Sequence, residues 1–599
     1  MEVGPLAASA WGIAEGYHDI SGRWVTPDRE TVSGVLALLG AGEEGPPPSP
    51  VRFVRPGEHL TLEGPHELVT EDGARLLAEH GLPPGLELGY HTLTRLSDGR
   101  SERLIVTPGR CFLPEHLRAW GWAIQLYAVR SRASWGIGDL ADLRAAAGWS
   151  AELGAEVLLL NPLHAPLPLE PQEPSPYFPS SRRFRSPLYI RVEEVPGARR
   201  LGSRLDSLAG EARALNASRV LDRDRVLELK MAALEEIFAG FEGSREFDSY
   251  LDREGSGLED YATFCASCEM QRLPWQEWPE ELRHPANPAV AGFRNEQRDR
   301  VRFHQWLQWL LEEQLKAASG AVGLIHDLAI GARPDGADAW LWQDQYAQGV
   351  TIGAPPDPFN ATGQDWGLPP FNPWRLRAAG YEPFIQTMRS AFRHGAGLRI
   401  DHVMGLFRQF WIPAGSGPAD GVYVQYPYHD LLDILALESW RAGAFVIGED
   451  LGTVEDRVRE EMAARRMASY HLLWFEDRPP HDYRPESMAA LTTHDLPTLA
   501  GVWEGTDADP GVRERLYRFG GAADGIDTEE VALSAHRALA ASPSLLVTAT
   551  LEDAIGVAER PNRPGTTTEW PNWALALPLT LEQMRDDPRP RRLAEVLRR

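Results

Sequence analysis

The sequence predicts an α/β protein whose main domain is a (β/α)8 TIM barrel with helical insertions, preceded by a small N-terminal β-sandwich domain. Between residues 116 and 599, dense apolar runs alternate with loops and helical periods, and eight such units can be counted. Between residues 51 and 107 the pattern changes to short alternating runs broken by glycine and proline. We therefore expect an N-terminal domain at residues 1–115 and the barrel at residues 116–599.

The composition is that of an acidic globular protein. Of 599 residues, 43% are hydrophobic and 24% are charged, and 86 acidic against 60 basic residues leave a net charge of −26. This charge repels nucleic acid and anionic membranes, so neither is expected as a partner. No basic leader precedes an apolar run at the N-terminus, and no stretch reaches the roughly 18 apolar residues of a membrane span. We expect a cytoplasmic location.

The N-terminal domain is predicted to begin with a short helical stretch. Thr26-Pro-Asp-Arg-Glu-Thr31 is a helix-start signal before an apolar run that stops at Gly40, and the Gly/Pro-rich residues 41–50 form a linker. The alternating runs from Val51 to Thr107 are typical of strands with one buried face, and they predict the β-sandwich.

The first three barrel strands are predicted at Trp122–Val129, Glu156–Asn161 and Gly323–Ile330, since each is a dense apolar run. Between the second and third strands, at about residues 191–318, the periodicity is helical, which predicts a helical insertion. A long loop is expected after the third strand, because the residues that follow it are rich in glycine and proline.

Two patterns inside the insertion have both a structural and a functional interpretation. Cys265 and Cys268 form a Cys-x-x-Cys pair, but no second pair or histidine cluster lies nearby, so core thiols are favoured over a metal or redox site. Trp306, Trp309 and Leu310 form a helical stripe, which favours core packing over a platform for a ligand.

The later barrel strands include three that end on a carboxylate. These residues are Asp401 in Gly397–Gly405, Glu449 in Phe445–Gly452 and Asp495 in Leu491–Thr498, while the sixth and eighth strands are expected at Ser469–Phe475 and Ser544–Leu551. Barrel enzymes place their chemistry at this end of the strands, so we expect the three carboxylates to face one cleft. A single acidic residue here is usually a turn former or helix cap, but three in series favour an active site.

Three motifs around these carboxylates carry a family resemblance. They are Arg-Ile-Asp-His at 399–402, Gly-Glu-Asp-Leu-Gly at 448–452 and Thr-His-Asp-Leu-Pro-Thr at 493–498. They resemble the 4-α-glucanotransferases (amylomaltases, disproportionating enzymes) of the α-amylase superfamily, from about Trp122 to Trp573. The resemblance implies transfer of α-1,4-glucan segments from a donor maltodextrin to the 4-hydroxyl of an acceptor glucose or maltodextrin, by a retaining double displacement. These sugars are the expected partners.

Cleavage of the acetal between two glucose units requires two carboxyl groups in opposite protonation states. We assign Asp401 as the nucleophile, because Arg399 and His402 should favour its ionised form. Glu449 is assigned as acid and then base, since an enclosed site and a neighbouring negative charge should raise its pKa.

The resemblance implies that Asp495, with His494, grips the hydroxyls of the donor sugar and stabilises its distorted transition state, and that His402 adds a hydroxyl contact. Metal binding by the two histidines is the rival interpretation. Neither lies in a His-x-x-x-His or His-x-x-Glu-His arrangement, so we expect no metal and no cofactor.

Five further residues enter only through the resemblance. Ser175 and Tyr177 match a segment that lines the sugar cleft, and Asp327 matches the first sugar-contacting segment of the superfamily. Asp357 and Trp366 match the flexible loop that covers the acceptor side. This loop favours transfer over hydrolysis, because a sugar hydroxyl must reach the glucosyl-enzyme before water does.

Three alternatives remain open at this point. An α-glucan hydrolase or debranching enzyme would use the same carboxylates. A barrel that only binds glycan is less expected, because a binder gains nothing from three uncompensated acids in one cleft. The N-terminal β domain could bind glycan or only pack against the barrel, and we expect the structural role because accessory modules more often have one.

Overall fold

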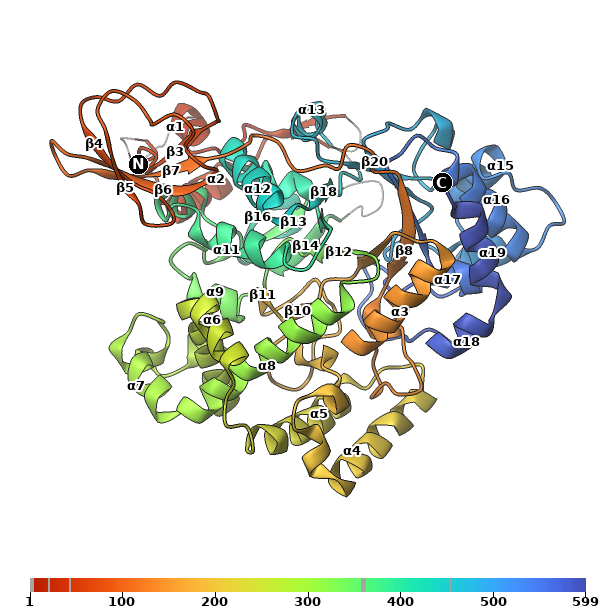
Figure 1. The fold of residues 1–599 in the computed structure, drawn as a ribbon. Helices are drawn as coiled ribbons and strands as arrows, with labels where there is room; N and C mark the ends of the chain where they lie inside the picture. Colours follow the sequence, from red (N-terminus) through yellow and green to blue (C-terminus); the bar gives the residue numbers. More distant parts are fainter. Residues whose placement is uncertain (1–4, 20–21, 43–44, 357–361, 453) are drawn as a thin grey trace.

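The computed structural model describes residues 5–19, 22–42, 45–356, 362–452 and 454–599, and at its centre lies a barrel of eight parallel strands (Figure 1). A parallel bridge between Ile447 and Ala468 joins the first and last strands of the sheet and closes the ring. The predicted TIM barrel is therefore confirmed. In the order in which they pair, the strands are β18 (Phe445–Gly448), β15 (Gly397–Ile400), β12 (Gly323–Leu328), β9 (Val157–Leu160), β8 (Ala119–Ile124), β21 (Leu546–Thr550), β20 (Ser487–Ala490) and β19 (Ser469–Leu472).

Several barrel strands end earlier than the sequence predicts, and two of them differ by five residues. β8 stops at Ile124, because Leu126–Ala128 turn into a 3-10 helix and the Leu126 N–H donates to the Asn161 side chain at 2.7 Å. The seventh strand is β20, and Leu491–Thr498 is the loop that follows it. In this loop the Thr492 hydroxyl donates to the Pro497 carbonyl at 2.9 Å, so the loop is held by its own hydrogen bonds rather than by strand pairing.

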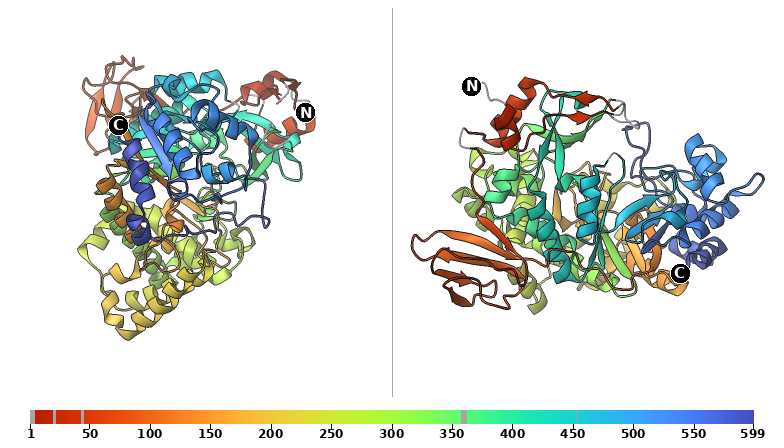
Figure 2. Two further views of the ribbon diagram at one scale, coloured as in Figure 1. Left: turned by 90° about the vertical axis from the view of Figure 1, so that its right-hand side faces the viewer. Right: turned by 90° about the horizontal axis from the view of Figure 1, so that it is seen from above.

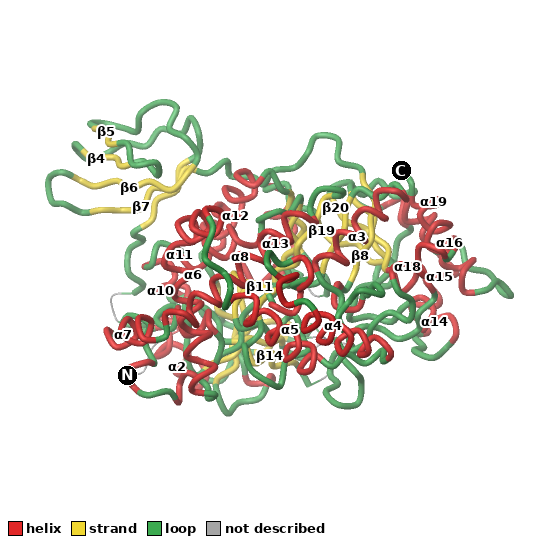
Figure 3. The backbone as a smooth tube through the Cα atoms, turned by 60° about the horizontal axis from the view of Figure 1, so that its bottom comes forward, coloured by secondary structure: helices red, strands yellow, loops and turns green. Residues whose placement is uncertain are grey.

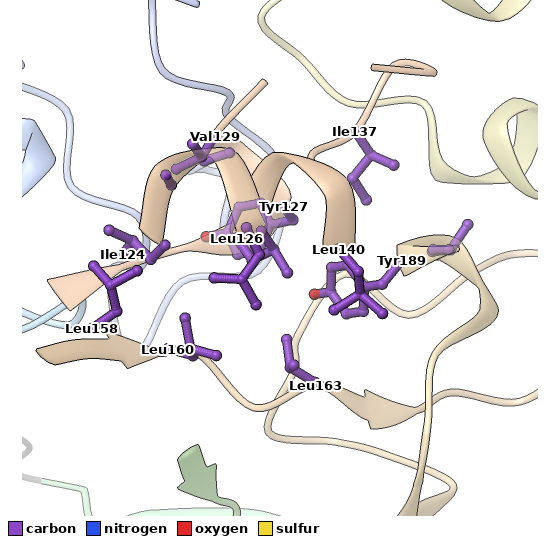
Figure 4. Packing of buried hydrophobic residues seen from close by; sticks show 14 of the residues in the cluster. Ile124, Leu126, Tyr127, Val129, Ile137, Leu140, Leu158, Leu160, Leu163 and Tyr189 are labelled. Atoms are coloured by element: carbon purple, nitrogen blue, oxygen red, sulfur yellow. The ribbon is translucent and has the colours of Figure 1, made fainter. Parts of the chain in front are cut away.

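The turn after β8 is held by the main hydrophobic core. Leu126 and Tyr127 of the 3-10 helix are buried and gather with Leu158 and Leu160 of β9 (Figure 4). Burial of large apolar side chains is the dominant favourable term in folding. This packing fixes the carboxyl ends of β8 and β9 relative to each other.

Helices cover the outside of the barrel (Figures 2 and 3). Asp139 caps the first of them in a capping box with Asp142, which satisfies backbone N–H groups at the helix start. No helix among the described residues is long and apolar enough to cross a membrane. The helices on the barrel are α3 (Leu140–Leu153), α11 (Glu382–Ala391), α12 (Tyr428–Ala442), α13 (Asp456–Ala464), α14 (Leu499–Glu504), α15 (Pro510–Phe519), α16 (Thr528–Ala540), α17 (Leu551–Ile555), α18 (Leu581–Asp586) and α19 (Pro588–Leu597).

The region between β9 and β12 is helical, as the sequence predicts. Trp306, Trp309 and Leu310 are buried in its core, as are the free thiols Cys265 and Cys268, which agrees with the structural interpretation of both patterns. Burial raises the pKa of the Cys268 thiol to about 12, which keeps it protonated. The helices are α4 (Ser203–Ala214), α5 (Arg223–Phe238), α6 (Arg245–Gln271), α7 (Pro288–Glu296) and α8 (Arg298–Ala318), preceded by the hairpin of β10 (His164–Ala165) and β11 (Ser181–Arg185).

Two of the four strands of a second, antiparallel sheet lie where a long loop was expected after the third barrel strand. Its strands, in order, are β14 (Gln364–Leu368), β13 (Val350–Ala354), β16 (Arg408–Pro413) and β17 (Val422–Gln425), and the short helices α9 (Ala337–Leu341) and α10 (Pro373–Ala378) flank it in the chain. The expectation was wrong because the glycines that suggested a loop lie within or beside the strands. Gly353 of β13 has no room for a side chain, since a Cβ there would lie 2.0 Å from the Gln364 carbonyl oxygen.

The N-terminal segment packs on the edge of this second sheet. Ile13 bridges to Val424, and the Gln425 N–H donates to the Gly12 carbonyl at 2.7 Å, which extends the sheet beyond β17. The segment contains α1 (Pro5–Ala10), the hairpin of β1 (Tyr17–His18) and β2 (Trp24–Val25), and α2 (Arg29–Leu39).

The small β domain stands at one corner of the molecule (Figure 3). It forms a single five-stranded sheet with its own core around Leu68, Leu93 and Leu104, and the apolar face is covered by loop residues such as Leu62 rather than by a second sheet. The boundaries at residues 1–115 and 116–599 stay predictions. The strands, in order, are β3 (Val51–Val54), β7 (Ser101–Val106), β6 (Gly89–Arg95), β4 (His66–Val69) and β5 (Arg75–Ala78).

A buried group of charges joins the start of the helical insertion to the barrel. The Arg191 guanidinium donates to Asp139 at 2.6 Å and to Asp142 at 2.8 Å, and all three side chains are at least nine-tenths buried. Burial and the neighbouring Asp139 charge raise the pKa of Asp142 to about 6. Lys230 lies 4.0 Å from Asp139 and donates to the backbone carbonyls of Leu188 and Ile190.

Replacement of Arg191 by Met should therefore cost about 3–5 kcal/mol of unfolding free energy, because two buried carboxylates lose their main cation. Chemical denaturation at pH 7 measures the loss. The control is Arg144→Met, which removes a pair with Glu194 whose side chains are 44% and 36% exposed. The control should lose less than about 1 kcal/mol. Equal losses in the two variants would contradict the prediction.

Candidate active site

A cleft of about 400 Å³ opens at the carboxyl ends of the barrel strands. Eight residues singled out from the sequence line it, and they come from five separate segments of the chain. These residues are Ser175, Tyr177, Trp366, Asp401, His402, Glu449, His494 and Asp495. Arg399 and Asp327 lie next to it, lining a smaller cavity of about 40 Å³ that also reaches His494. Asp357 lies outside the described residues.

The register of the parallel strands brings the charged groups together. Arg399 of β15 is the Cα partner of Asp327 on β12, and Ile400 is the partner of Gly448 on β18. Asp401 and Glu449 are the next residues along their two strands. Because side chains at matched positions of neighbouring strands lie close together, two acids that are 48 residues apart in the sequence become neighbours.

Arg399 is the central cation of the site. It donates from Nη1 to both carboxylate oxygens of Asp327 at 2.7 and 2.8 Å and to Asp401 at a longer 3.3 Å. The Tyr177 hydroxyl donates to the same Asp327 carboxylate at 2.6 Å. Asp327 therefore makes the shorter hydrogen bonds with the Arg399 guanidinium, and Asp401 makes the longer and weaker one.

Glu449 is held by backbone N–H groups. One carboxylate oxygen accepts from the N–H of His402 at 2.9 Å, and the other accepts from the N–H of Leu451 at 2.8 Å. Burial raises its pKa, against the opposing effects of Arg399 and of these two hydrogen bonds. A carboxyl group in this environment retains its proton at higher pH than an exposed one, as a general acid must.

The pKa of Asp401 differs from the expectation drawn from the sequence, which favoured the ionised form. Burial raises its pKa to about 7, helped by the negative charges of Asp327 and Glu449 and opposed by Arg399. His402 contributes no positive charge at neutral pH, because burial lowers its own pKa to about 4. The Asp401 carboxyl group therefore titrates near neutral pH.

Asp495 and His494 form a pair with opposite pKa shifts. Burial disfavours both charges, but the mutual attraction at 3.4 Å outweighs it, so the pKa of His494 is raised and that of Asp495 is lowered. The Asn562 amide also donates to the Asp495 carboxylate at 2.6 Å. The lowered pKa favours the ionised form of Asp495, and its carboxylate lone pairs can accept from sugar hydroxyls.

Aromatic rings form one wall of the cleft. The ring centroids of Tyr177, His494 and Trp573 lie 5.0 to 5.4 Å from one another. The half-buried Trp366, which also lines the cleft, meets His402 edge-on, with ring centroids 5.2 Å apart. Flat apolar faces beside carboxylates suit the carbon faces and hydroxyl edges of a sugar ring.

Sequence reasoning missed several residues that line the cleft. Gln364, whose side chain accepts from the Trp366 indole N–H at 3.2 Å, lies two residues from a predicted position. Asn562 and Trp573 lie in the segment 562–573, at the end of the region that resembles the family. The similarity of that segment to the family was the signal that could have found them. The other missed residues are Phe178, Ile330, Leu368, Arg563, Pro564, Gly565 and Thr566.

Comparison with known proteins places this chain in a family. The family model described as 4-alpha-glucanotransferase matches residues 124–580. The chain belongs to the 4-alpha-glucanotransferase family. The relatives agree along the full length: the 4-alpha-glucanotransferase of Mycobacterium tuberculosis is 39% identical over 99% of this chain and 97% of its own, and that of Haemophilus influenzae is 33% identical over 96% and 95%.

A solved structure extends the similarity to three dimensions. The amylomaltase of Corynebacterium glutamicum superimposes with a TM-score of 0.86 at 32% identity, and the match covers 99% of both chains. The match therefore includes the N-terminal 115 residues, which lie before the region of the family model. In this family, the N-terminal module is thus shared with a structurally known member rather than specific to this chain.

The raised pKa of Asp401 predicts a pH-dependent effect of Asp401→Asn on stability. Between roughly pH 4 and 7 the folded protein retains a proton here that the unfolded chain has lost, so the cost of the buried charge grows as pH rises and is complete above about pH 7. Asn carries no such cost. Relative to wild type, Asp401→Asn should gain up to about 4 kcal/mol at pH 8 and much less at pH 5.

Unfolding by urea at the two pH values measures this gain. Asp495→Asn serves as a comparison of opposite sign, since the lowered pKa of Asp495 gives wild type a stability that is present at neutral pH and is lost as pH falls. A pH-independent difference for Asp401→Asn would contradict the pKa assignment.

Proposed function

We propose that this cleft transfers an α-1,4-glucan segment from a donor maltodextrin to the 4-hydroxyl of an acceptor glucose or maltodextrin, by a retaining double displacement. The observation that carries the proposal is the pairing of Asp401 with Glu449. The two acids follow adjacent strands, and the residue after Asp401 donates its backbone N–H to the Glu449 carboxylate at 2.9 Å. Two buried carboxyl groups linked in this way meet the minimum requirement of a glycosidase-type mechanism.

In the first half-reaction, protonated Glu449 donates its proton to the glycosidic oxygen, and the Asp401 carboxylate attacks the anomeric carbon. The bond from that carbon to the leaving sugar breaks as the bond to Asp401 forms, which leaves a glycosyl ester and a free 4-hydroxyl on the leaving sugar. Positive charge at the anomeric carbon stabilises ionised Asp401 in the transition state. The pKa of Asp401, raised to about 7, is compatible with this role.

In the second half-reaction, the Glu449 carboxylate takes the proton from the acceptor 4-hydroxyl, whose oxygen attacks the anomeric carbon and displaces Asp401. The starting configuration is restored by the two inversions. Backbone N–H groups from His402 and Leu451 support the negative charge that Glu449 carries between the two steps.

The donor ring is held by the charged pair and the aromatic wall. Ionised Asp495, oriented by His494 and Asn562, accepts hydrogen bonds from ring hydroxyls, and these bonds strengthen as the ring flattens toward the transition state. Tyr177 presents its ring beside His494 while its hydroxyl is fixed by Asp327. Ser175, which accepts from the Tyr177 N–H at 3.3 Å, orders the same wall.

The acceptor side is covered by the β13–β14 hairpin. Trp366 lies on β14 against His402, where it offers an indole face to an incoming glucose and excludes water from the glycosyl ester. Asp357, which lies outside the described residues, belongs to the same proposed cover. This cover is the feature that favours transfer over hydrolysis.

The direct test is the product pattern from maltotriose. The wild-type protein should convert it to glucose and a ladder of longer maltodextrins, whereas a hydrolase or debranching enzyme would yield no products longer than the substrate. Asp401→Asn should lower turnover by at least about three orders of magnitude with the fold retained. The control is Asp477→Asn, because the Asp477 side chain is 86% exposed in a surface pair with Arg515. Near-normal turnover in folded Asp401→Asn would end the nucleophile assignment.

Trp366→Ala should lower transfer far more than hydrolysis, because it removes both the acceptor platform and the cover over the ester. The measurement is the ratio of reducing sugar released to ladder formed from maltotriose, which should rise by about tenfold. Trp440→Ala, at a half-exposed tryptophan of α12, is the matched control and should leave the ratio unchanged. If Trp366 only fills a gap beneath the hairpin, both reactions will fall together and the ratio will stay constant.

A further inference from the structure

Trp573 belongs to the cleft wall in a backbone conformation that tryptophan rarely adopts. Its φ is 58°, in the left-handed region, and the side chain is buried against His494 and Tyr177. This conformation costs an L residue about 1–2 kcal/mol, so surrounding contacts must hold it. The position of the indole ring therefore depends on what fixes the Trp573 backbone.

The backbone N–H and the backbone carbonyl of Trp573 both form hydrogen bonds with residues outside the aromatic wall of the cleft. Its N–H donates to the Pro561 carbonyl at 2.8 Å, and its carbonyl accepts from the Arg223 guanidinium. Arg223 is the first residue of α5 in the helical insertion, is buried, and lies over the Tyr127 ring at 5.1 Å. A charged donor on a buried carbonyl is one of the stronger hydrogen bonds in a protein.

The chain on both sides of this bond is also paired. The Leu221 N–H donates to the Ala574 carbonyl at 2.8 Å, and the Ala576 N–H donates to the Arg219 carbonyl at 2.7 Å. Between these bonds, Val220 and Leu575 form an antiparallel bridge. The segment 219–223 of the insertion is therefore laid along the segment 573–576, and Arg223 is its contact nearest to the cleft.

A continuous set of contacts runs from Trp573 to the proposed nucleophile. The Trp573 ring packs on Tyr177, the Tyr177 hydroxyl donates to Asp327, and Asp327 shares the Arg399 guanidinium with Asp401. The ring also packs on His494, which pairs with Asp495. A shift of Trp573 would thus reach the donor-binding pair and the partner of the nucleophile together.

We propose that Arg223 is a positioning residue for the reaction, which acts through the Trp573 carbonyl to hold the indole against His494 and Tyr177. The helical insertion would then have a role in catalysis as well as in packing, although none of its helices supplies a group to the chemistry. The proposal rests on the proposed function of the cleft. It assigns to Trp573 the task of keeping His494 and Tyr177 in place around the donor ring.

The test is a double-mutant cycle on Arg223 and Trp573, read by fluoride release from α-maltosyl fluoride. Fluoride release reports bond cleavage whether the sugar then goes to an acceptor or to water, so the cycle is informative even if the maltotriose ladder is absent. Arg223→Met should lower kcat by about tenfold with KM changed less than about threefold. In the Trp573→Ala background, Arg223→Met should lower kcat little further, because the indole through which Arg223 acts is already absent.

Arg219→Met is the matched control. Its guanidinium donates to the Ala576 carbonyl at 3.1 Å in the same paired segment, but farther along the chain from the indole. This variant should keep its kcat. Independent, multiplying losses from Arg223→Met and Trp573→Ala, or an equal fall in kcat for Arg219→Met, would overturn the proposal. If Arg223→Met does not fold, Arg223→Lys, which keeps the charge but displaces the donor, replaces it in the cycle.

Discussion

One buried guanidinium lies at the centre of the cleft, and the charge balance of the site depends on it. Arg399 carries the positive charge that the cluster of Asp327, Asp401 and Glu449 requires, because several carboxylates cannot remain ionised together away from water without a cation. Its place is set by the barrel: β12 and β15 pair so that Asp327 and Arg399 occupy matched positions. The electrostatics of the site therefore follow from strand register.

Arg399 bonds unequally to the neighbouring acids, and this difference suits the acids to different proposed roles. Asp327 accepts the two short hydrogen bonds from Arg399, and Asp401 accepts the longer one. The pKa of Asp401 therefore stays raised, at about 7. Asp495 instead has its own partner in His494 and stays ionised. Environments that push the pKa values of neighbouring acids apart allow one cleft to hold the proposed nucleophile, the proposed acid and the proposed hydroxyl acceptor together.

The predictions from sequence succeeded where a short apolar run marks a strand and a carboxylate follows it directly. The barrel strands could be recognised because strands buried on both faces are dense apolar runs, and Asp401 and Glu449 follow such runs directly. Asp495 was recognised by its motif although it lies in the loop after β20 rather than at a strand end. The second sheet could not be foreseen, since Gly353 and Gly367 suggest a loop until their partners across the sheet are known.

The residues that act through contacts at long range were beyond the sequence alone. Nothing near Arg223 indicates that its guanidinium reaches a carbonyl 350 residues later, and nothing near His402 indicates that burial keeps it neutral. By itself the sequence determined the barrel and the family and pointed to the three acids proposed for the site, because these are encoded in short runs of residue types. Only the tertiary structure decided how Arg399 is shared and which acid is ionised, because pKa values depend on burial and on distances between side chains that the fold alone brings together.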